Sequence, residues 1–419
     1  MIPRIFTGLL LVALSAGTAA QGGEQGVGGP PLLIRVDGKY GYIGRDGKVL
    51  VKPQFAYALN FVAGMARVEL DKQWTYINEA GELMTKKFDK PARFMDGYYN
   101  FSDGMAVYRV GGKEKRTPDG YRTVIVGGKY GYINKAGEVV IPVSFDGALG
   151  FHDGLAAAKS DNKWGFIDRH GKFAIPARYE DATDFVVGLA RVKVEGKWSF
   201  IDKQGKLLGQ AKFDEADVHC DGLARVMVAG KFGFVNTRGE VVIEPKLDYA
   251  GHFSDSRSLA RVDRKEGEKL HLTFGFIDKT GRFVIPAKYG DAQDFSDGLA
   301  AVRINSPFTD KKGPDSMWGY IDKDGAYVIT PRFYQVGYFS EGLAAASPKT
   351  LAPFGYIDRT GKFVIEPQFD LRTGPFMKGI AHVYTDRDFK TRDDHGYIDR
   401  AGKFLWPLRS PPKNSPFPK

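Results

Sequence analysis

Apolar and polar residues alternate in short runs along most of the chain, and Gly, Asp or Pro separates one run from the next. Residues Leu155–Lys159, Lys163–Ile167 and Phe173–Ile175 show this pattern within one compact stretch. Alternation with a period of two, broken by turn-forming residues, is typical of β-strands. The pattern therefore predicts three short strands, followed by a connector over Ala177–Gly188 that leads to the next group.

This group recurs along the chain, and its aromatic-Gly-aromatic triplet marks each copy. A fixed period of about 34 residues in the middle of the chain is the signature of a repeat architecture. Helical repeats are excluded, because the chain holds 52 glycines, which weaken helix interiors, and its apolar positions alternate. The copies are anchored at Tyr40, Trp74, Tyr130, Trp164, Trp198, Phe232, Phe274, Trp318, Phe354 and, in degenerate form, His395.

The recurrence predicts an all-β protein made of tandem three-stranded repeats. About nine units and a terminal half-unit fill residues 33–408. We expect an open array or solenoid. A closed β-propeller is the alternative, although propeller blades usually have four strands and about 40–45 residues.

The central strand of each copy is expected to form the repeat core. Trp164 and Phe166 point to one face of the strand, and Gly165 and Ile167 point to the other. A recurring Gly indicates that something packs against bare backbone, and we expect this to be the neighbouring repeat. The aromatic columns could instead be platforms on which sugars stack. The predicted core positions are Trp74, Trp164, Gly165, Trp198, Gly233, Gly275, Trp318, Gly319 and Gly355.

A column of aspartates marks the turn after each central strand. In Asp168-Arg169-His170-Gly171 the Asp side chain can accept bonds from the following amides, and Gly suits the last position. One carboxylate per turn is too sparse for Ca²⁺, which needs several oxygen ligands. We therefore predict structural turns, with no metal or cofactor site.

The motif Lys-Trp-Gly-Phe-Ile-Asp…Gly-Lys…Ile-Pro…Phe…Gly-Leu-Ala resembles the bacterial WG-repeat family, also called KWG repeats, over about residues 34–408. The resemblance implies an all-β repeat fold and leaves the biochemical role open. Four places depart from the motif and are expected to pack less regularly: Thr75, Ser199, Lys206–Gln210 and His395.

The ends of the chain differ from the repeats. Residues 1–20 combine Arg4, a short apolar run and a small-residue site, which predicts a secretory signal peptide cleaved between Ala20 and Gln21. A Gly/Pro-rich linker over residues 21–32 and a basic, Pro-rich disordered tail over 409–419 flank the array. We expect a bacterial periplasmic or secreted protein with no transmembrane segment after signal removal.

Extra residues enter the repeats mostly at one hairpin position, so insertions should project from one edge of the array. This edge is a candidate partner-binding surface, and free drift in loop length is the alternative. The candidate binding residues are Lys113, Lys115, Arg116, Tyr121, Arg122, Lys265, Lys269, Lys311, Lys312, Arg387 and Lys390.

The net charge of +10 arises from 60 basic and 50 acidic side chains. This mixed surface favours weak attraction to anionic polymers and lacks the clustered footprint of a nucleic-acid binder. The single Cys220, next to His219, and the scattered histidines form no catalytic or metal-binding motif. The sequence thus predicts an exported non-catalytic scaffold that binds a protein or polymer. A cell-envelope carbohydrate binder and a hydrolase with a carboxylate site assembled across repeats remain alternatives.

Overall fold

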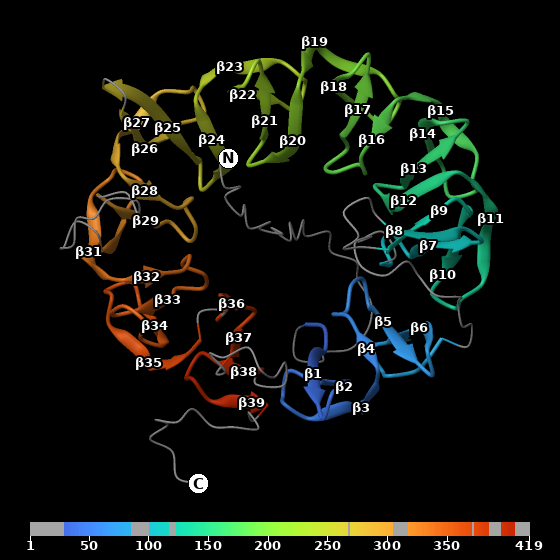
Figure 1. Cartoon of the computed structure of the whole chain (residues 1–419), viewed down its shortest axis with the longest axis horizontal. Helices are drawn as coiled ribbons and strands as arrows, with labels where there is room; N and C mark the ends of the chain where they lie inside the picture. The colour runs from blue at the N-terminus through green and yellow to red at the C-terminus, as the bar shows by residue number, and fades with distance from the viewer. Residues whose placement is uncertain are drawn as a thin grey trace, which may run out of the picture.

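The computed structural model describes residues 29–84, 100–116, 123–266, 269–304, 317–370, 373–384 and 395–406. In this part of the chain ten small sheets stand side by side around a ring, and we call them blades 1–10 in chain order (Figure 1). The all-β tandem-repeat prediction is confirmed. The repeats close into a propeller, which was the alternative arrangement, and do not form the open array that we favoured.

Three blades contain three described strands. Blade 1 holds β1 (Leu32–Val36), β2 (Lys39–Ile43) and β3 (Val49–Phe55), blade 2 holds β4 (Tyr57–Ala58), β5 (Met65–Leu70) and β6 (Gln73–Asn78), and blade 3 holds β7 (Met105–Val110), β10 (Lys129–Asn134) and β11 (Val139–Phe145).

The other seven blades contain four strands each. Blade 4 holds β12 (Gly147–His152), β13 (Leu155–Ser160), β14 (Lys163–Ile167) and β15 (Phe173–Tyr179), blade 5 holds β16 (Asp181–Ala182), β17 (Ala190–Val194), β18 (Lys197–Ile201) and β19 (Leu207–Phe213), and blade 6 holds β20 (Glu215–Cys220), β21 (Leu223–Val228), β22 (Lys231–Asn236) and β23 (Val241–Leu247). Blade 7 holds β24 (Tyr249–Ser254), β25 (Arg257–Glu266), β26 (Lys269–Ile277) and β27 (Phe283–Tyr289), and blade 8 holds β28 (Asp291–Ala292), β29 (Ala300–Arg303), β30 (Trp318–Ile321) and β31 (Tyr327–Phe333). Blade 9 holds β32 (Gln335–Val336), β33 (Ala344–Ser347), β34 (Phe354–Ile357) and β35 (Phe363–Phe369), and blade 10 holds β36 (Phe376–Met377), β37 (Ile380–Tyr384), β38 (His395–Asp399) and β39 (Phe404–Trp406).

Each blade is an antiparallel meander whose first strand lies nearest the centre of the ring (Figure 1). The prediction of three strands per unit is wrong for these seven blades, because the connector contains an extra inner strand. In blade 5 this strand is β16, which pairs with β17 through Asp181 and Ala182 alone. So short a strand is defined by its pairing and leaves no alternating pattern in the sequence.

The recurring Gly of the central strand packs against its own blade. A Cβ added to Gly165 would lie 2.6 Å from both Ile175 O and Ala177 N, which belong to the outer strand β15. The ladder between β14 and β15 shifts register at this point, so a bulge around Pro176 brings backbone over the glycine. The predicted contact with the neighbouring repeat is therefore wrong. The same approach of the outer strand occurs at Gly41, Gly131, Gly233, Gly275, Gly319 and Gly355.

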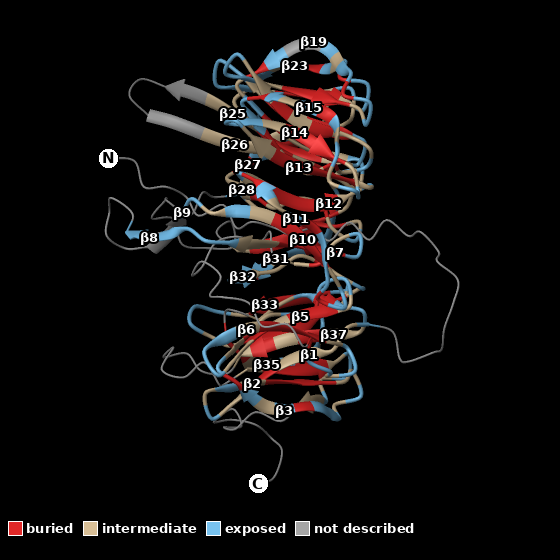
Figure 2. Ribbon diagram, turned by 90° about the vertical axis from the view of Figure 1, so that its right-hand side faces the viewer, coloured by how far each residue is buried: buried red, intermediate tan, exposed pale blue. Residues whose placement is uncertain are grey.

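The hydrophobic core lies between adjacent blades (Figure 2). Phe166 of blade 4 is fully buried and meets Phe185 of blade 5 edge to face, with ring centroids 4.8 Å apart. Such pairs contribute about 0.5–1.5 kcal/mol each beyond the burial of their area. Equivalent pairs between successive blades are Tyr42–Phe61, Tyr132–Phe151, Phe234–Phe253, Phe276–Phe295, Tyr320–Phe339 and Tyr356–Phe376.

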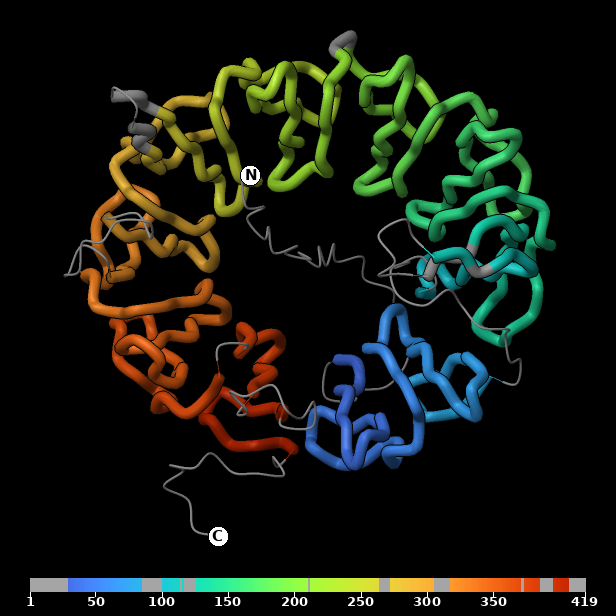
Figure 3. The backbone as a smooth tube through the Cα atoms, viewed as in Figure 1, coloured from blue at the N-terminus to red at the C-terminus, as the bar shows by residue number. Residues whose placement is uncertain are grey.

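Blade 10 closes the ring by packing on blade 1, so the two ends of the chain's fold lie side by side (Figure 3). The Tyr397 hydroxyl donates a 2.8 Å hydrogen bond to Leu33 O. The equivalent Tyr42 hydroxyl donates to Leu59 O of the next blade, so closure uses the same donor as the other interfaces but a different acceptor position, on β1. Arg45 also donates to Lys378 O at 3.0 Å.

The predicted signal peptide with its cleavage site at Ala20 and Gln21, residues 21–28 of the predicted linker, and the C-terminal tail lie outside the described residues. No helix within the described ranges has the length and apolar character needed to cross a membrane.

Candidate functional site

The meander gives the ring two distinct faces. In the four-stranded blades, the turns between first and second strands, and between third and fourth strands, lie on one face, which we call the clasp face. The hairpins between second and third strands lie on the opposite face, which we call the insert face. In blades 1 and 3 the first described strands, β1 and β7, correspond to the second strand of a four-stranded blade, so the β1–β2 and β7–β10 connections belong to the insert face. These faces carry different chemistry.

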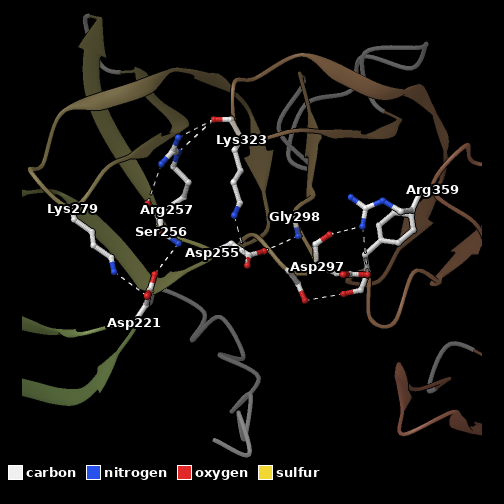
Figure 4. Close-up of polar contacts among 11 residues, drawn as sticks. Asp221, Asp255, Ser256, Arg257, Lys279, Asp297, Gly298, Lys323 and Arg359 are labelled. Atoms are coloured by element: carbon white, nitrogen blue, oxygen red, sulfur yellow. Dashed lines mark hydrogen bonds and ion pairs between the residues drawn. The ribbon is translucent and has the colours of Figure 1, made fainter.

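On the clasp face, an acidic residue of the motif Phe-Ser-Asp-Gly or of a close variant ties several blades to the next one (Figure 4). Asp255 Oδ2 accepts a 2.7 Å hydrogen bond from the Gly298 amide, and Asp297 Oδ2 accepts one from Gly342 at the same distance. We call this carboxylate-to-amide bond the clasp. Other clasps join Asp103 to Gly154, Asp153 to Gly188, Asp221 to Ser256, and Glu341 to Gly379.

Two further bonds support the clasp. The Ser296 hydroxyl, one residue before Asp297, donates to Phe339 O of the next blade at 2.8 Å. A cation from the next blade's outer turn also approaches the carboxylate, as Lys279 Nζ does at 2.9 Å from Asp221 Oδ1 (Figure 4). These aspartates are therefore occupied in holding blades together.

Removing one clasp should weaken the ring measurably. Asp255→Ala is expected to lower the free energy of unfolding by about 1–2 kcal/mol, because the Gly298 amide and Lys323 lose their anionic partner. Chemical denaturation of the whole chain measures this effect. Asp324→Ala is the control, since this exposed carboxylate on the same face makes no hydrogen bond within the described residues. Equal losses in both variants would contradict the clasp.

The second column of aspartates forms the predicted turns. Asp168 Oδ1 accepts bonds from the amides of His170 and Lys172 at 2.9 and 3.0 Å. Gly171 closes the turn by donating to Asp168 O at 3.0 Å. The turn prediction is confirmed at this position. Within the described residues no group of three or more His, Cys, Asp or Glu side chains is arranged to hold a metal ion.

The clasp motif breaks down in neighbouring blades. Val187 stands at the Asp position of blade 5, with 64% of its surface exposed and φ at +53°, a conformation that β-branched residues rarely adopt. In blade 6 His219 replaces the buried Phe, and Cys220 replaces the Ser. His152 stands at the Ser position of blade 4. His152, His219 and Cys220 lie on the inner strands β12 and β20, and Val187 lies in the turn between β16 and β17 of the blade between them.

A polar cluster accompanies these replacements on the inner strands and their neighbours. Arg225 of blade 6 binds Asp217 through Nε at 2.8 Å and Nη2 at 2.7 Å, and its Nη1 donates to Ala250 O of blade 7 at 2.6 Å. Arg191 of blade 5 donates to Ala216 O of blade 6 at 2.5 Å. Sequence reasoning missed this cluster, because its members come from different blades: Arg191 and Arg225 lie on β17 and β21, and Asp217 lies on β20.

Two carboxyl groups of this region have unusual proton affinity. Burial raises the pKa of Asp184 to about 6, against the opposing effects of His152 and Arg191. Burial also raises the pKa of Asp294 to about 6, and Arg225 opposes that shift. Both groups thus change charge near pH 6, which is a property of functional sites and of strained interiors alike.

The arrangement around His152 does not form a nucleophile relay. Ser102 Oγ lies 3.4 Å from His152 Nε2, and Asp184 Oδ2 lies 3.8 Å from the same nitrogen. A relay needs the nucleophile and the acid on opposite nitrogens of the imidazole. Ser102 instead donates its hydroxyl hydrogen to Phe151 O, as other clasp serines do. Burial raises the pKa of Cys220, which keeps it protonated and a poor nucleophile.

The repeat tryptophans are covered in part by cations. Trp318 is buried, and Trp74, Trp164 and Trp198 are half-buried. The guanidinium of Arg67 lies 4.7 Å from the Trp74 ring centroid. Lys193 and Arg303 cover Trp198 and Trp318 in the same way. The predicted core role of this column is consistent with these contacts, which cover part of the rings of Trp74, Trp198 and Trp318.

On the insert face, two hairpins project beyond the ring (Figure 2). One is the ribbon of β8 (Lys113–Arg116) and β9 (Thr123–Val126), inserted in blade 3. The other is the extension of β25 and β26 in blade 7, whose pairing continues to Glu266 and Lys269. Both leave the ring on the same side, as predicted from the common insertion position.

The structure places some of the candidate binding residues and leaves others undescribed. Lys113, Lys115 and Arg116 are exposed on β8. Lys265 and Lys269 lie on β25 and β26, near the tip of the β25–β26 extension. The binding role of these five residues stays a prediction. The candidates outside the described residues are Tyr121, Arg122, Lys311, Lys312, Arg387 and Lys390.

Several solved structures show a distant likeness to this chain. A crystal structure of a eukaryotic initiation factor is 13% identical, with a TM-score of 0.48 over 79% of this chain and 93% of that one. Hsv2 of Kluyveromyces lactis is 5% identical, with a TM-score of 0.28 over 55% of this chain and 86% of that one. The virginiamycin B lyase of Staphylococcus aureus is 13% identical, with a TM-score of 0.27 over 54% of this chain and 91% of that one. No curated protein matches the sequence.

A family model identifies the repeat itself. The WG containing repeat matches residues 40–74, 74–113, 130–164, 164–198, 198–232, 232–265, 274–306, 318–347 and 354–384. These nine matches span most of the ring and begin or end at the aromatic anchors of the central strands. The chain belongs to the WG-repeat family.

Proposed function

We propose that this protein is an exported, non-catalytic scaffold whose insert face binds a protein or an anionic envelope polymer. The observation that carries the proposal is the projection of two ribbons, β8–β9 and the end of β25–β26, from the same face of a rigid ring. Loops presented by a repeat framework are a common way to build a binding surface. Export and the absence of catalysis are part of the proposal.

The chemistry of the other surfaces supports this choice. The clasp carboxylates are already bonded to the next blade, so these acidic groups are not free to bind a partner. The tryptophan column is half-buried under cations, which weakens the carbohydrate alternative. Asp184 and Asp294 lie in blades 5 and 8 with two blades between them, so these two acids cannot form the carboxylate pair that the hydrolase alternative needs. Among the described residues, the insert face remains as the surface that projects exposed cations away from the ring.

Trimming the two ribbons tests the proposal. In the first variant a two-residue turn replaces residues 111–128, and in the second it replaces residues 264–271. We expect both variants to fold with unchanged thermal midpoints, because the described strand residues of each segment pair only within their own hairpin and not with the other strands of the ring. Pull-down from a bacterial envelope extract should recover a partner with the full mature chain and lose it with the double variant.

A clasp-face variant with two substitutions, Lys172→Glu and Lys362→Glu, is the control and should retain the partner. Equal recovery of the same partner by the trimmed and full chains would refute an insert-face role. N-terminal sequencing of the exported protein tests cleavage between Ala20 and Gln21, and a mature chain starting elsewhere would contradict that site.

A further inference from the structure

The β8–β9 ribbon is a separate sheet and not a longer part of blade 3. Within the described chain β8 pairs only with β9, through Lys113–Val126, Glu114–Ile125, Lys115–Val124 and Arg116–Thr123. The β25–β26 extension differs, since its ladder runs without a break from the blade to its tip. Among the described strands, the ribbon therefore has two free edges, whereas the blade strands beneath it are paired.

Two Gly-Gly pairs create this separation. Gly111 and Gly112 precede β8 with φ of +78° and +102°, and Gly127 and Gly128 follow β9 with φ of +78° and +85°. These four glycines lie in the left-handed region and interrupt the extended backbone on both sides of the hairpin. A Cβ on Gly128 would lie 2.7 Å from Gly111 O, so the two linkers pack tightly against each other. The ribbon is thereby turned away from the blade's own ladder.

The free edge of β8 carries a regular charge pattern. Lys113 and Lys115 are two residues apart, so their side chains project from the same face of the strand, and both are exposed. Arg116 is exposed on the other face. An edge strand presents backbone amides and carbonyls that an added strand can pair with, and alternate side chains then select its sequence.

We propose that the β8 edge binds an extended acidic polypeptide segment by strand addition, with acidic residues at alternate positions opposite Lys113 and Lys115. This inference rests on the proposed insert-face function and names the class of its partner. A second copy of this chain is a less favourable occupant of the same edge, because the antiparallel register that sets Lys113 of one copy opposite Lys115 of the other brings like charges together across the new ladder, which is destabilising. A four-residue edge offers only a few hydrogen bonds, so we expect weak binding with a dissociation constant of about 0.1–1 mM.

Synthetic peptides provide the test. The probe is a fluorescein-labelled peptide that alternates Glu with Val or Thr, and binding to the full mature chain is followed by fluorescence polarisation at low salt. We expect saturable binding that N-methylation of alternate peptide amides abolishes, because this change blocks the ladder and keeps the charge. The same peptide with Lys in place of Glu should not bind.

Reversing the charge of the two lysines distinguishes a loss of peptide recognition from a misfolded ribbon. The double variant Lys113→Glu/Lys115→Glu should weaken the acidic peptide at least about fivefold and should gain binding of the Lys peptide, which shows that its ribbon is intact. The clasp-face control Lys172→Glu/Lys362→Glu should bind the acidic peptide as the parent chain does. Sedimentation should show a monomer in all samples.

Four outcomes would overturn the proposal. They are no binding by the parent chain, equal binding of the N-methylated peptide, no exchange of preference in the double variant, and self-association through the ribbon. The envelope partner could still be lost on trimming while the peptides fail. In that case the insert-face function would stand and strand addition at β8 would be wrong.

Discussion

Replacing Gly165 by valine is expected to lower the free energy of unfolding by about 3 kcal/mol or more, a severe loss for one substitution. The new Cβ would lie 2.6 Å from Ile175 O and Ala177 N. Both are backbone atoms, so no side-chain rotation relieves the overlap. The central and outer strands of blade 4 must then separate locally. Urea denaturation followed by fluorescence measures the loss.

The chain contains its own control for this effect. Ser199 occupies the same position in blade 5 and is already buried there, so its side chain has room. Ser199→Ala should change stability by less than about 1 kcal/mol. An unchanged denaturation midpoint for Gly165→Val would show that the outer strand does not press on the glycine.

The comparison of Gly165 with Ser199 shows which structural differences between blades can be predicted from the local sequence. In blade 4 the outer strand shifts register beside Phe166, whereas in blade 5 Phe200 and Ile201 pair with Leu208 and Leu207 without a shift. The bulge of β19 lies further along, where Gly209 has φ of +68°. The missing Gly and the missing Ile-Pro of this copy therefore have one cause, which is the displaced bulge of the outer strand. This agrees with the less regular packing that we expected for this copy.

Features that depend on neighbouring residues were predictable. The strand over Lys163–Ile167 and the turn at Asp168 follow from alternation and turn chemistry, and the structure has both. Closure was not predictable in this way, because it depends on the rotation from blade to blade summed over all copies. Contacts such as Tyr397 to Leu33 join residues at opposite ends of the chain.

The candidate sites also differ in whether the local sequence could predict them. The common side of the inserts followed from one hairpin position in every copy, and both described ribbons lie there. The inner polar cluster did not follow, because Asp217 looks like an ordinary residue of a solvated connector, and Arg225 looks like an ordinary polar position of an alternating strand. The signal that could have revealed it is the loss of the Phe-Ser-Asp-Gly motif, seen most clearly at Val187.

Replacing Asp294 by asparagine is expected to stabilise the protein at neutral and alkaline pH. Burial raises the pKa of Asp294 in the folded chain to about 6, above its ordinary value of 3.8. The folded state therefore holds this proton more tightly than the unfolded state does. Stability from the protonated form is fully present below about pH 4 and is lost as pH rises through about 6.

The surroundings of Asp294 explain this shift. Its Oδ1 is buried without a hydrogen-bond partner among the described residues. This oxygen packs against Gly251 of blade 7, and a Cβ added to that glycine would lie 2.6 Å from it. Arg225 is the cation that favours the ionised form, and the two tyrosines Tyr249 and Tyr338 are further groups in electrostatic contact with this carboxyl. An ionised oxygen in that position lacks the solvation that water would give it.

The side chain introduced by Asp294→Asn is a neutral amide of nearly the same shape, so it imitates the protonated acid. A shift of about two pKa units corresponds to about 3 kcal/mol, and partial solvent access reduces the expected gain to about 1–3 kcal/mol at pH 8. Denaturation at pH 4, 6 and 8 measures it. The variant should exceed the parent chain at pH 8, and the two should converge at pH 4.

Asp248→Asn gives the opposite sign and serves as the control. A side-chain hydrogen bond from Lys231 lowers the pKa of Asp248, and its other oxygen accepts a 3.0 Å bond from the Asp263 amide. Its ionised form therefore supports the fold, and the variant should lose stability at pH 8 while approaching the parent chain as the carboxylate is protonated in acid. One result would contradict this account: Asp294→Asn is less stable than the parent chain by the same amount at pH 8 and at pH 4. The carboxyl would then act through its shape and hydrogen bonds, and its burial between blades 7 and 8 would carry no cost from the negative charge.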